Sequence, residues 1–342
     1  MPGTIYDVAS KAGVSISTVS RVLNKNPNVL EDTRQKVLVA IAELDFKPSS
    51  LARGLVAKQS NLIQVLFSWY EKKCDFRNYW YVSILNGVNE AVQEKDYGLL
   101  VNTVAGIFDP EAIYERVFRN AMDGILVISP YLKEKELLKM SGSRVPMVLI
   151  GHRIPQLPID TVDSDNIGAA HQAVEHLVGL GHKKIGFISG PLDYNTDSAD
   201  RLAGYKEAMA KNGLAIPEGY IQEGRFSKES GAEAAEKFLA LKDRPTAIFS
   251  SDDLMAMGAW DTFEKAGLKI GKDISIVGFD DIPESSQEPY SLTTIRQDFH
   301  RISLEGTKIL LEKIKKPEGW ETQKILVPVQ LTLRKSTGPV KA

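Results

Sequence analysis

TIYDVASKAGVSISTVSRVLN, residues 4–24, decides the fold of the first part of the chain. Thr4 can cap a helix, and Gly13 can end it because glycine adopts a positive φ without strain. The apolar positions of this helix recur at helical spacing: Ile5, Val8, Ala9 and Ala12. Ser15 can cap a second helix, so the stretch predicts a helix-turn-helix with a tight glycine-containing turn.

The second helix has an apolar face and a polar, basic face. Its inward positions are Val19, Val22 and Leu23, and its outward positions are Ile16, Ser17, Ser20 and Arg21. Such a helix fits the major groove of DNA, and Arg21 can reach guanine or phosphate. No acidic residue lies between Val8 and Leu30. These features favour DNA contact over the alternative of a generic helical hairpin with a solvated polar face.

A third helix closes the small core of this unit. We expect Asp32 or Thr33 to cap it, Leu44 to lie near its end, and its core side chains to be Val37, Leu38, Ile41 and Leu44. Pro48 ends the unit, and Ser49 can cap a short helix over 50–56. This helix combines Leu51 and Leu55 with the cations Arg53 and Lys58, which suits insertion into a minor groove.

Length, composition and charge indicate a modular cytoplasmic protein. The 342 residues exceed one typical core, and the 43% of hydrophobic residues leaves no case for global disorder. Neither a signal peptide nor a membrane span is expected, and the single Cys74 offers no disulfide or zinc spacing. Although the net charge is −2, residues 1–60 hold eight Lys or Arg and five Asp or Glu. Positive charge is therefore concentrated where DNA contact needs it.

The rest of the chain alternates short aliphatic runs with helical stretches, which predicts an α/β body. The expected strands are 62–67, 98–102, 124–128, 147–150, 185–189, 247–250, 274–278 and 324–334. The expected helices are 82–94, 112–120, 133–139, 167–180, 201–212, 228–241 and 254–266. The strands fall into two series, one before Lys184 and one from Lys184 onward, and these predict two lobes. A ligand cleft is expected outside the carboxyl ends of their parallel strands.

Side chains just after the strands are candidates for this cleft. From the first lobe they are Phe76, Trp80, Tyr81, Tyr131, His152 and Arg153, and from the second Tyr194, Thr196, Arg201, Phe226, Asp252, Asp253 and Asp280. Carboxylates and arginine suit vicinal hydroxyls, and an aromatic face covers the apolar side of a sugar ring. Core or dimer packing is the alternative for Trp80 and Tyr81, and for Tyr81 it fits as well as the cleft. Asp165 and Asn166 are expected to cap the helix over 167–180.

The run at 4–24, the stretch EDTRQKVLVAIAELDFKPSSLARGLV at 31–56 and the body after it resemble the lactose/galactose repressor family along nearly the whole chain. The resemblance implies base contacts by Ile16, Ser17 and Arg21, and phosphate contacts mainly by Thr4, Ser15, Thr18, Ser20 and Asn24. It also implies that Leu55 intercalates in the minor groove, with Ser50 and Arg53 beside it.

Four motifs of the α/β body also resemble those of the family, and they indicate which residues contact the effector in the cleft. DRLAGY points to Arg201, VGFDD to Asp280, SDDLMAMGA to Asp252 and EGRFSKESG to Phe226 as effector contacts. Trp80, Tyr81, Arg153 and Thr196 complete the expected effector set. Gly151 stands where the family often has an acid, and Arg153, with no acid near it in the sequence, suggests the hypothesis of a phosphorylated or acidic ligand.

The resemblance implies three parts. These are a helix-turn-helix domain over 1–47, a hinge helix and linker over 48–60, and an effector-binding and dimerisation domain over 61–342. The last is expected to be a body like a periplasmic binding protein, with parallel sheets covered by helices on both faces. Its first lobe is expected over 61–161 and 293–322, its second over 162–292 and 323–337, and its dimer interface over 82–92 and 254–263.

The function implied is a homodimeric transcription repressor on pseudo-palindromic operator DNA, controlled by a sugar or sugar phosphate, without a cofactor or metal. Two alternatives stay open: control mainly by a partner protein, and a sugar-processing enzyme. No catalytic motif such as G-x-S-x-G supports the enzyme. A free solute-binding protein would leave the first sixty residues unexplained. The sequence names neither the ligand nor the sign of its effect.

Overall fold

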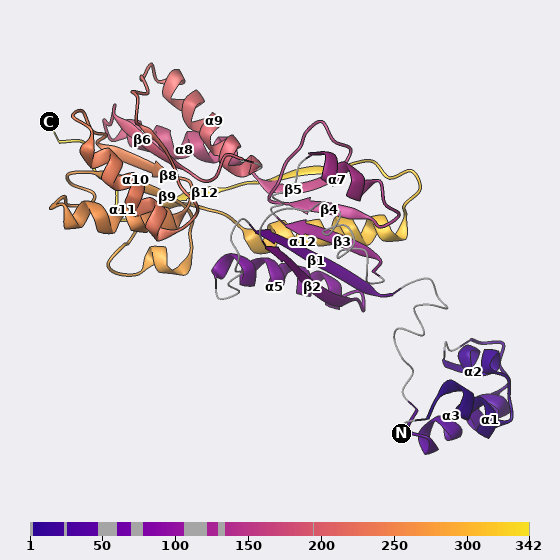
Figure 1. The fold of residues 1–342 in the computed structure, drawn as a ribbon. Helices are drawn as coiled ribbons and strands as arrows, with labels where there is room; N and C mark the ends of the chain where they lie inside the picture. Colours follow the sequence, from indigo (N-terminus) through magenta and orange to yellow (C-terminus); the bar gives the residue numbers. More distant parts are fainter. Residues whose placement is uncertain are drawn as a thin grey trace. The chain divides into compact units, whose positions relative to one another are not determined.

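A computed structural model describes residues 3–23, 26–46, 60–69, 78–105, 122–128, 134–193 and 195–341. The chain forms two compact units, Met1–Asn61 and Leu62–Ala342 (Figure 1). Several predicted features lie outside the described residues: the helices over 50–56 and 112–120, and Asn24, Ser50, Arg53, Leu55, Phe76, Tyr131 and Tyr194. No helix in the described ranges has both the length and the apolar character that a membrane crossing requires.

The first unit contains the predicted helix-turn-helix. Helix α1 is Ile5–Ala12, α2 is Ile16–Leu23 and α3 is Glu31–Glu43. Thr4 caps α1 in a reciprocal capping box with Asp7, and Gly13 ends it with φ of 65°. The fully buried side chains at the centre are Val8, Val19 and Val37. Three short helices therefore share one small core.

Two details of α3 differ from the prediction. The helix begins at Glu31 after Leu30, without a side-chain cap, so Asp32 and Thr33 lie in its first turn. Leu38 is 44% exposed and does not belong to the core. The reason is helical geometry, because 37, 40, 41 and 44 form one stripe and residue 38 lies about 100° away from it.

The first lobe of the second unit is built on a parallel sheet in the order β11-β5-β4-β3-β1-β2. Its strands are β1 Leu62–Trp69, β2 Gly98–Ala105, β3 Gly124–Ile128, β4 Met147–Ile150, β5 Asp160–Ser164 and β11 Lys324–Val327. Helices α5 (Tyr79–Gln93) and α12 (Phe299–Lys315) pack in the core of one face, and α7 (Glu134–Ser141) packs on the other. Alternate residues of β3 and β4 enter the two cores, which is why these two strands are apolar throughout.

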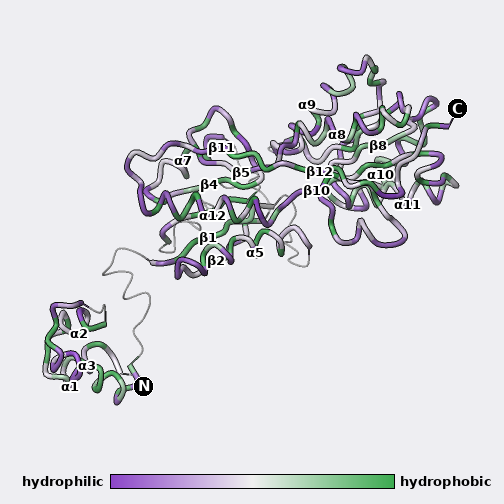
Figure 2. Tube along the Cα trace, turned by 180° about the vertical axis from the view of Figure 1, so that it is seen from behind, coloured by the Kyte–Doolittle hydropathy of each residue, from purple (hydrophilic) through white to green (hydrophobic). Residues whose placement is uncertain are grey.

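The second lobe has a sheet in the order β12-β10-β9-β8-β6-β7, parallel except for the edge strand β12. Its strands are β6 Ile185–Ser189, β7 Ile221–Glu223, β8 Ala247–Ser250, β9 Ser275–Asp280, β10 Thr293–Arg296 and β12 Gln330–Thr332. Helices α8 (Asn166–Gly179) and α9 (Thr196–Lys211) cover one face, and α10 (Lys228–Ala240) and α11 (Asp253–Lys265) cover the other. Figure 2 shows hydrophobic residues along the central strands of both sheets.

Glycines bring α10 and α11 into close contact. A Cβ added at Gly258 would lie 1.9 Å from the Lys228 carbonyl oxygen, and one at Gly231 would lie 2.0 Å from that of Met255. No side chain fits at either position, so the two helices pack backbone against backbone. This pair of helices covers one face of the second sheet.

The chain passes between the two sheets three times: between β5 and α8, between β10 and α12, and between β11 and β12. These crossings fall a few residues later than the expected boundaries after 161, 292 and 322, because β5 and β11 pair in the first sheet and β10 pairs in the second. The single strand expected over 324–334 is two strands in different sheets. Pro328 separates them, since proline cannot donate to a ladder.

Candidate functional site

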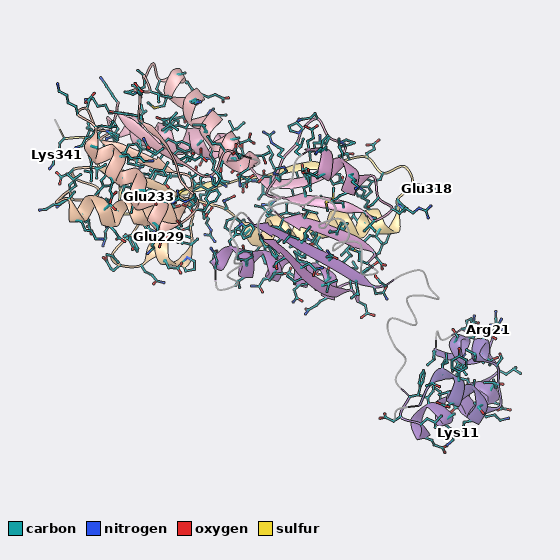
Figure 3. All side chains as sticks on the ribbon, in the orientation of Figure 1. Lys11, Arg21, Glu229, Glu233, Glu318 and Lys341 are labelled. Carbon is teal, nitrogen blue, oxygen red and sulfur yellow. The ribbon has the colours of Figure 1, made fainter. Side chains whose placement is uncertain are left out.

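Helix α2 presents the outward face that the sequence predicts. Ile16 is 40% exposed, and Ser17 and Arg21 are exposed as well. Figure 3 shows Arg21 projecting from the three-helix unit. Val19 and Val22 anchor the opposite face in the core. The three predicted base-reading side chains therefore share an accessible surface that a major groove can accept.

Hydroxyl groups cluster at the start of this helix. Ser15 Oγ lies 2.8 Å from Ser17 Oγ and 2.9 Å from Thr18 Oγ1, and it accepts a hydrogen bond from the Thr18 amide. Thr4 is exposed, but its hydroxyl already donates to the Asp7 carboxylate at 2.7 Å. Thr18 and Ser20 are half-buried. Phosphate contacts by these four residues stay predictions, with Ser15 placed best for one at a helix N-terminus.

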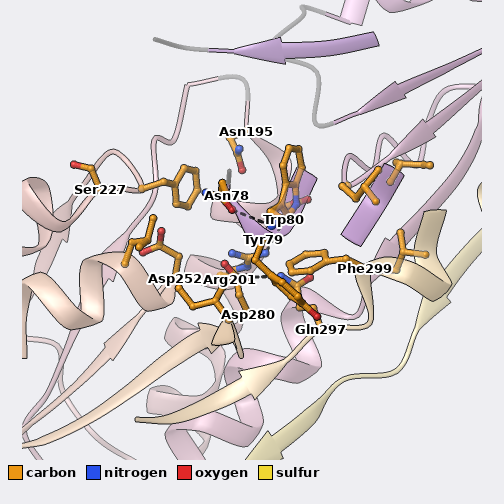
Figure 4. A pocket seen from close by; sticks show the side chains of 18 of the residues that line it. Asn78, Tyr79, Trp80, Asn195, Arg201, Ser227, Asp252, Asp280, Gln297 and Phe299 are labelled. Carbon is orange, nitrogen blue, oxygen red and sulfur yellow. Dashed lines mark hydrogen bonds and ion pairs between the residues drawn. The ribbon is translucent and has the colours of Figure 1, made fainter. Parts of the chain in front are cut away.

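The second unit holds a cavity of about 310 Å³ lined by residues of both lobes (Figure 4). Aromatic side chains form part of its wall: Tyr79 and Trp80 from α5, Phe226 from the loop before α10, and Phe299 at the start of α12. Acidic side chains form much of the rest: Asp163, Asp197, Asp252, Asp280 and Glu284. Its cations are Arg201 and Arg225, and the Arg225 guanidinium binds Glu233 at 2.8 Å.

Arg201 organises the buried polar groups of the cavity. Its Nε donates to Asn166 Oδ1 at 2.8 Å, and its Nη1 donates to the Ser251 carbonyl at 2.6 Å. Its Nη2 lies 4.0 Å from Asp197 Oδ2, and the guanidinium carbon lies 3.8 Å above the Phe279 ring. Arg201 is only 5% exposed and is held on all sides. It is therefore a fixed positive charge among acids from several strands.

Burial changes the ionisation of the acids around Arg201. It raises the pKa of Asp252 to about 8, and the neighbouring Asp280 adds to the rise. It also raises the pKa of Asp280 to about 7 and that of Asp197 to about 6, with the Arg201 charge opposing both rises. The pKa of Asp163 is raised by burial and by the charge of Asp197. Near neutral pH the cavity therefore holds acidic groups in both protonation states.

The end of β9 is held in an unusual backbone conformation. Asp280 has φ of 113° and Asp281 has φ of 59°, both in the region that favours glycine. Gln297 Nε2 donates to Asp280 Oδ1 at 2.6 Å, and Arg334 Nη2 donates to Asp281 Oδ1 at 2.5 Å. Such strain persists where surrounding contacts fix it, often at ligand sites. Here it aims the Asp280 carboxyl into the cavity.

Five of the eight predicted effector residues line the cavity: Trp80, Arg201, Phe226, Asp252 and Asp280. Tyr81 does not, because its side chain is fully buried in the first-lobe core, where its ring lies 4.9 Å from that of Phe67. Asp253, a wider candidate, is also structural. It accepts hydrogen bonds from Thr294 Oγ1 at 2.6 Å and from the Ile282 amide at 3.0 Å.

Arg153 and Thr196 lie outside the cavity wall and join the two lobes instead. The Arg153 guanidinium donates to Asp200 at 2.9 Å, and its amide donates to Thr196 Oγ1 at 3.0 Å. Buried His152 lies 3.2 Å from the same hydroxyl, and burial lowers the pKa of this imidazole to about 4. The argument for a phosphate ligand from an unpaired Arg153 is thus wrong, because folding supplies an acid 47 positions away in the sequence.

Several lining residues were missed by the sequence prediction: Asn78, Tyr79, Asp163, Asn195, Asp197, Gln297 and Phe299. Asp163 belongs to β5, which has no apolar run, so it could not be placed after a strand. Asn78 and Asn195 cap α5 and α9, and helix starts at strand ends are the signal that could have found them. Asp165 caps α8 as predicted, whereas Asn166 binds Arg201.

Both units of the chain match known proteins. Residues 4–49 match the model of "Bacterial regulatory proteins, lacI family", and residues 174–337 match that of "Periplasmic binding protein-like domain". Catabolite control protein A of Priestia megaterium is 34% identical over 337 residues, which span 98% of this chain and 99% of that protein. The HTH-type transcriptional repressor PurR of Photobacterium profundum is 35% identical over 337 residues, spanning 97% and 98%.

Solved structures of regulators are similar to this chain over nearly its whole length. The lac repressor dimer bound to operator and the anti-inducer ONPF has a TM-score of 0.85 and 31% identity, covering 99% of this chain and 100% of that one. The complex of the transcriptional regulator CelR with cellobiose has a TM-score of 0.75 and 27% identity, covering 98% and 99%. The named relatives are regulators of transcription, and they match both units of this chain.

Proposed function

Because the chain belongs to the lacI family of bacterial regulatory proteins and is a DNA-binding transcription regulator, we propose that it represses transcription as a homodimer under the control of a sugar-like ligand. One observation carries this proposal. A unit with an exposed recognition helix and a unit with a cavity between two lobes occur in one chain. The site of action is the cytoplasm, where operator DNA lies.

On the DNA side, α2 enters the major groove with Ile16, Ser17 and Arg21 toward the bases. Arg21 reads guanine or binds phosphate, and Ile16 supplies an apolar contact of the kind that a thymine methyl group accepts. A single helix of eight residues contacts too few bases for a unique site. Two copies related by a two-fold axis read the two halves of a pseudo-palindrome, as a dimer geometry requires.

On the ligand side, the cavity suits a small polyhydroxylated ring. About 310 Å³ is at the lower end of the range for ligand sites, which favours a molecule of one or two rings. Trp80 and Phe226 offer flat apolar faces to such a ring, while Asp252, Asp280 and Arg201 offer hydrogen-bond partners to its hydroxyls. A phosphorylated ligand is less favoured, because Arg153, Arg201 and Arg225 are already bound to Asp200, Asn166 and Glu233.

We propose that the relative tilt of the two lobes controls DNA binding. A ligand that contacts both lobes favours one of their relative tilts, and the shift in population reaches the linker that carries Leu55. We propose that Leu55 of each copy inserts into the minor groove at the operator centre, with Ser50 and Arg53 beside it. Ligand binding then strengthens or weakens that insertion, according to which tilt it favours.

Two measurements test the proposal. Leu55→Ala should weaken binding to a selected operator by about tenfold or more while leaving binding to random DNA within about twofold. Equal losses on both DNAs would remove the minor-groove role. Titration with sugars and sugar phosphates, with and without operator, should find a ligand that changes operator affinity. If only a cell extract containing a partner protein changes that affinity, the small-molecule control is refuted.

A further inference from the structure

Gly190 and Phe226 are each an unusual residue type for the backbone at their position. Phe226 has φ of 56°, in the left-handed region that favours glycine. Gly190 directly follows β6, and its φ lies outside that region. The backbone therefore calls for no glycine at position 190 and disfavours phenylalanine at position 226. A contact between the two residues accounts for both choices.

The Phe226 ring occupies the place of the side chain that Gly190 lacks. A Cβ added at Gly190 would lie 2.1 Å from Phe226 Cζ and 2.4 Å from its Cε1, closer than close-packed carbon atoms approach one another. Gly190 is buried, and of the two residues only Phe226 lines the cavity. The ring is therefore the layer of the wall that lies between Gly190 and the cavity.

The loop that carries Phe226 is held on both sides of this residue. Ser227, the residue after it, caps α10 and accepts a hydrogen bond from the Ser230 amide at 3.3 Å. Gly224, two residues before it, donates its amide hydrogen to the carbonyl of Ser189 at 2.8 Å. The loop is thus tied to α10 and to the end of β6. A larger residue after Ser189 must displace the ring toward the cavity, because the loop cannot move away.

The position of this ring affects the size of the cavity. Phe226 forms part of the wall from the second lobe, and Trp80 forms part of it from the first. The volume of about 310 Å³ is near the lower end of the range for ligand sites, about 300–1,000 Å³. One sugar ring covered by aromatic faces suits such a space. A second ring would need the space that the phenyl group of Phe226 fills.

We propose that Gly190 and Phe226 together set the size of the ligand, because the ring seated on Gly190 leaves room for one sugar ring and excludes a second. This inference rests on the proposed function and specifies the ligand of the same site. Phe226 is the residue that contacts the ligand. Gly190 is a positioning residue, since it acts only by letting the ring lie back from the cavity.

Titration calorimetry on the full chain tests the size limit. The probes are the hexoses glucose, galactose and mannose and the disaccharides cellobiose, lactose and maltose. At least one hexose should bind about tenfold more tightly than any of the disaccharides. Phe226→Ala removes the phenyl group, so a disaccharide should then bind at least as tightly as that hexose.

Gly190→Ala tests the positioning role in the same titrations. The added methyl pushes the ring into the cavity and should weaken the binding of the hexose by about tenfold or more. The double variant with Phe226→Ala should bind sugars as Phe226→Ala alone does, because no ring is left to displace.

Melting temperatures measured without ligand test the contact itself. Gly190→Ala should lower the melting temperature of the second unit by about 3 °C or more, since overpacking must displace the ring. In the Phe226→Ala background the same substitution should change the melting temperature by less than about 1 °C.

Ser198 and Gly186 supply the controls. A Cβ at Gly190 would also lie 2.4 Å from Ser198 Oγ, but this hydroxyl has no hydrogen-bond partner among the described residues and can rotate. Ser198→Ala should therefore recover much less of the lost melting temperature than Phe226→Ala does. A Cβ at Gly186 of β6 would lie 2.9 Å from Ile248 Cδ1, and neither residue lines the cavity. Gly186→Ala should lower the melting temperature and leave the preference among sugars unchanged.

The proposal is overturned if Phe226→Ala keeps the preference for the hexose, or if Gly190→Ala lowers the melting temperature equally with and without the Phe226 ring. Recovery by Ser198→Ala in place of Phe226→Ala would also overturn it. Operator affinity measured in parallel separates the two proposals. A disaccharide that binds the unmodified chain as tightly as any hexose and alters operator affinity leaves the regulator intact and removes only the size limit. If none of these sugars binds the chain or its Phe226→Ala variant, the size limit and the sugar-like ligand fail together.

Discussion

Arg153 and Asp200 form an ion pair of 2.9 Å that ties the loop after β4 to α9, and so ties one lobe to the other. Both side chains are about one quarter exposed, at 28% and 24%. Thr196 lies one turn before Asp200. Its Oγ1 accepts a hydrogen bond from the Arg153 amide and lies beside His152. These contacts join the two lobes beside the cavity without lining it, so they stabilise one arrangement of the lobes.

Arg153→Gln should therefore act on the tilt and leave the ligand contacts in place. Loss of a partly exposed ion pair should cost about 1 kcal/mol, which corresponds to at most about fivefold in ligand affinity. The control is Lys211→Gln, which removes the exposed pair with Glu175 on the outer side of α9. Calorimetry checks both. A loss above about a hundredfold in Arg153→Gln would mean that Arg153 binds the ligand directly.

Arg201→Lys should be costly although it keeps the positive charge. Lysine has no planar fork, so it cannot serve Asn166, the Ser251 carbonyl and the Phe279 ring together. We expect a loss of about 2 kcal/mol in the free energy of unfolding, measured in urea, and loss of ligand binding. Arg244→Lys, at an exposed arginine after α10, should change unfolding by less than about 0.5 kcal/mol. Normal ligand affinity in Arg201→Lys would contradict the role assigned to the guanidinium.

Arg21→Ala should weaken specific DNA binding. Removal of one side chain from the exposed face of α2 should cost about 1–3 kcal/mol on a selected operator and relax the base preference at one position of each half-site. Lys36→Ala is the matched control, since Lys36 is an exposed cation of the same unit on α3. Binding assays against a library of operators separate the two. Equal effects of both variants would reduce Arg21 to a nonspecific contact.

His152 makes stability depend on pH on the acid side. Burial lowers the pKa of its imidazole in the folded protein to about 4, whereas the unfolded chain has a value of about 6.5. Above about pH 6.5 both states are neutral. As pH falls from about 6.5 to about 4, the unfolded state binds a proton that the folded state does not, so up to about 3 kcal/mol of stability is lost.

His152→Asn, which keeps a group able to bond Thr196, should remove that part of the pH dependence in urea unfolding. His300→Asn serves as the control because His300 is exposed and pairs with Glu90. An unchanged slope between about pH 6.5 and pH 4 in His152→Asn would refute the assignment.

Gly258→Ala should separate two helices that pack through their backbones. The added methyl would overlap the Lys228 carbonyl, so α10 and α11 must move apart at a cost of about 3 kcal/mol or more. Gly179→Ala provides the contrast, because a Cβ at Gly179 meets nothing within 4 Å. That variant should be neutral or more stable by up to about 1 kcal/mol in the same unfolding measurement. Equal stability of the two variants would show that the helices tolerate separation.

Most of the α/β pattern was predictable because buried parallel strands are apolar on both faces. Strands β3, β4, β6 and β8 begin and end where their aliphatic runs predict. Strand β5 was not predicted, since Asp160, Thr161, Asp163 and Ser164 carry no hydrophobic signal although all are buried. Its Asp160 is satisfied by Lys313 and Trp320, more than 150 positions later, and such partners exist only after folding. Strand β10 and helix α12 were also missed.

The candidate site shows the same division. Arg201, Asp252 and Asp280 follow strands or sit in motifs, so the sequence locates them. Arg153 lies outside the cavity because it pairs with Asp200 of the other lobe. These two residues are 47 positions apart in the sequence and meet only in the folded chain. The conformation of Asp280 likewise depends on Gln297, which lies in a crossing segment. Pairings between distant segments decide which expected residues reach the ligand.

The three crossings between the lobes also determine how the second unit assembles. Each sheet is completed by strands from separate stretches of the chain, since β11 joins β5 across about 160 positions and β12 joins β10 after α12 has returned to the first lobe. Neither lobe can thus be excised as a continuous gene fragment, and a chimaera that exchanges one lobe between relatives needs three matched junctions.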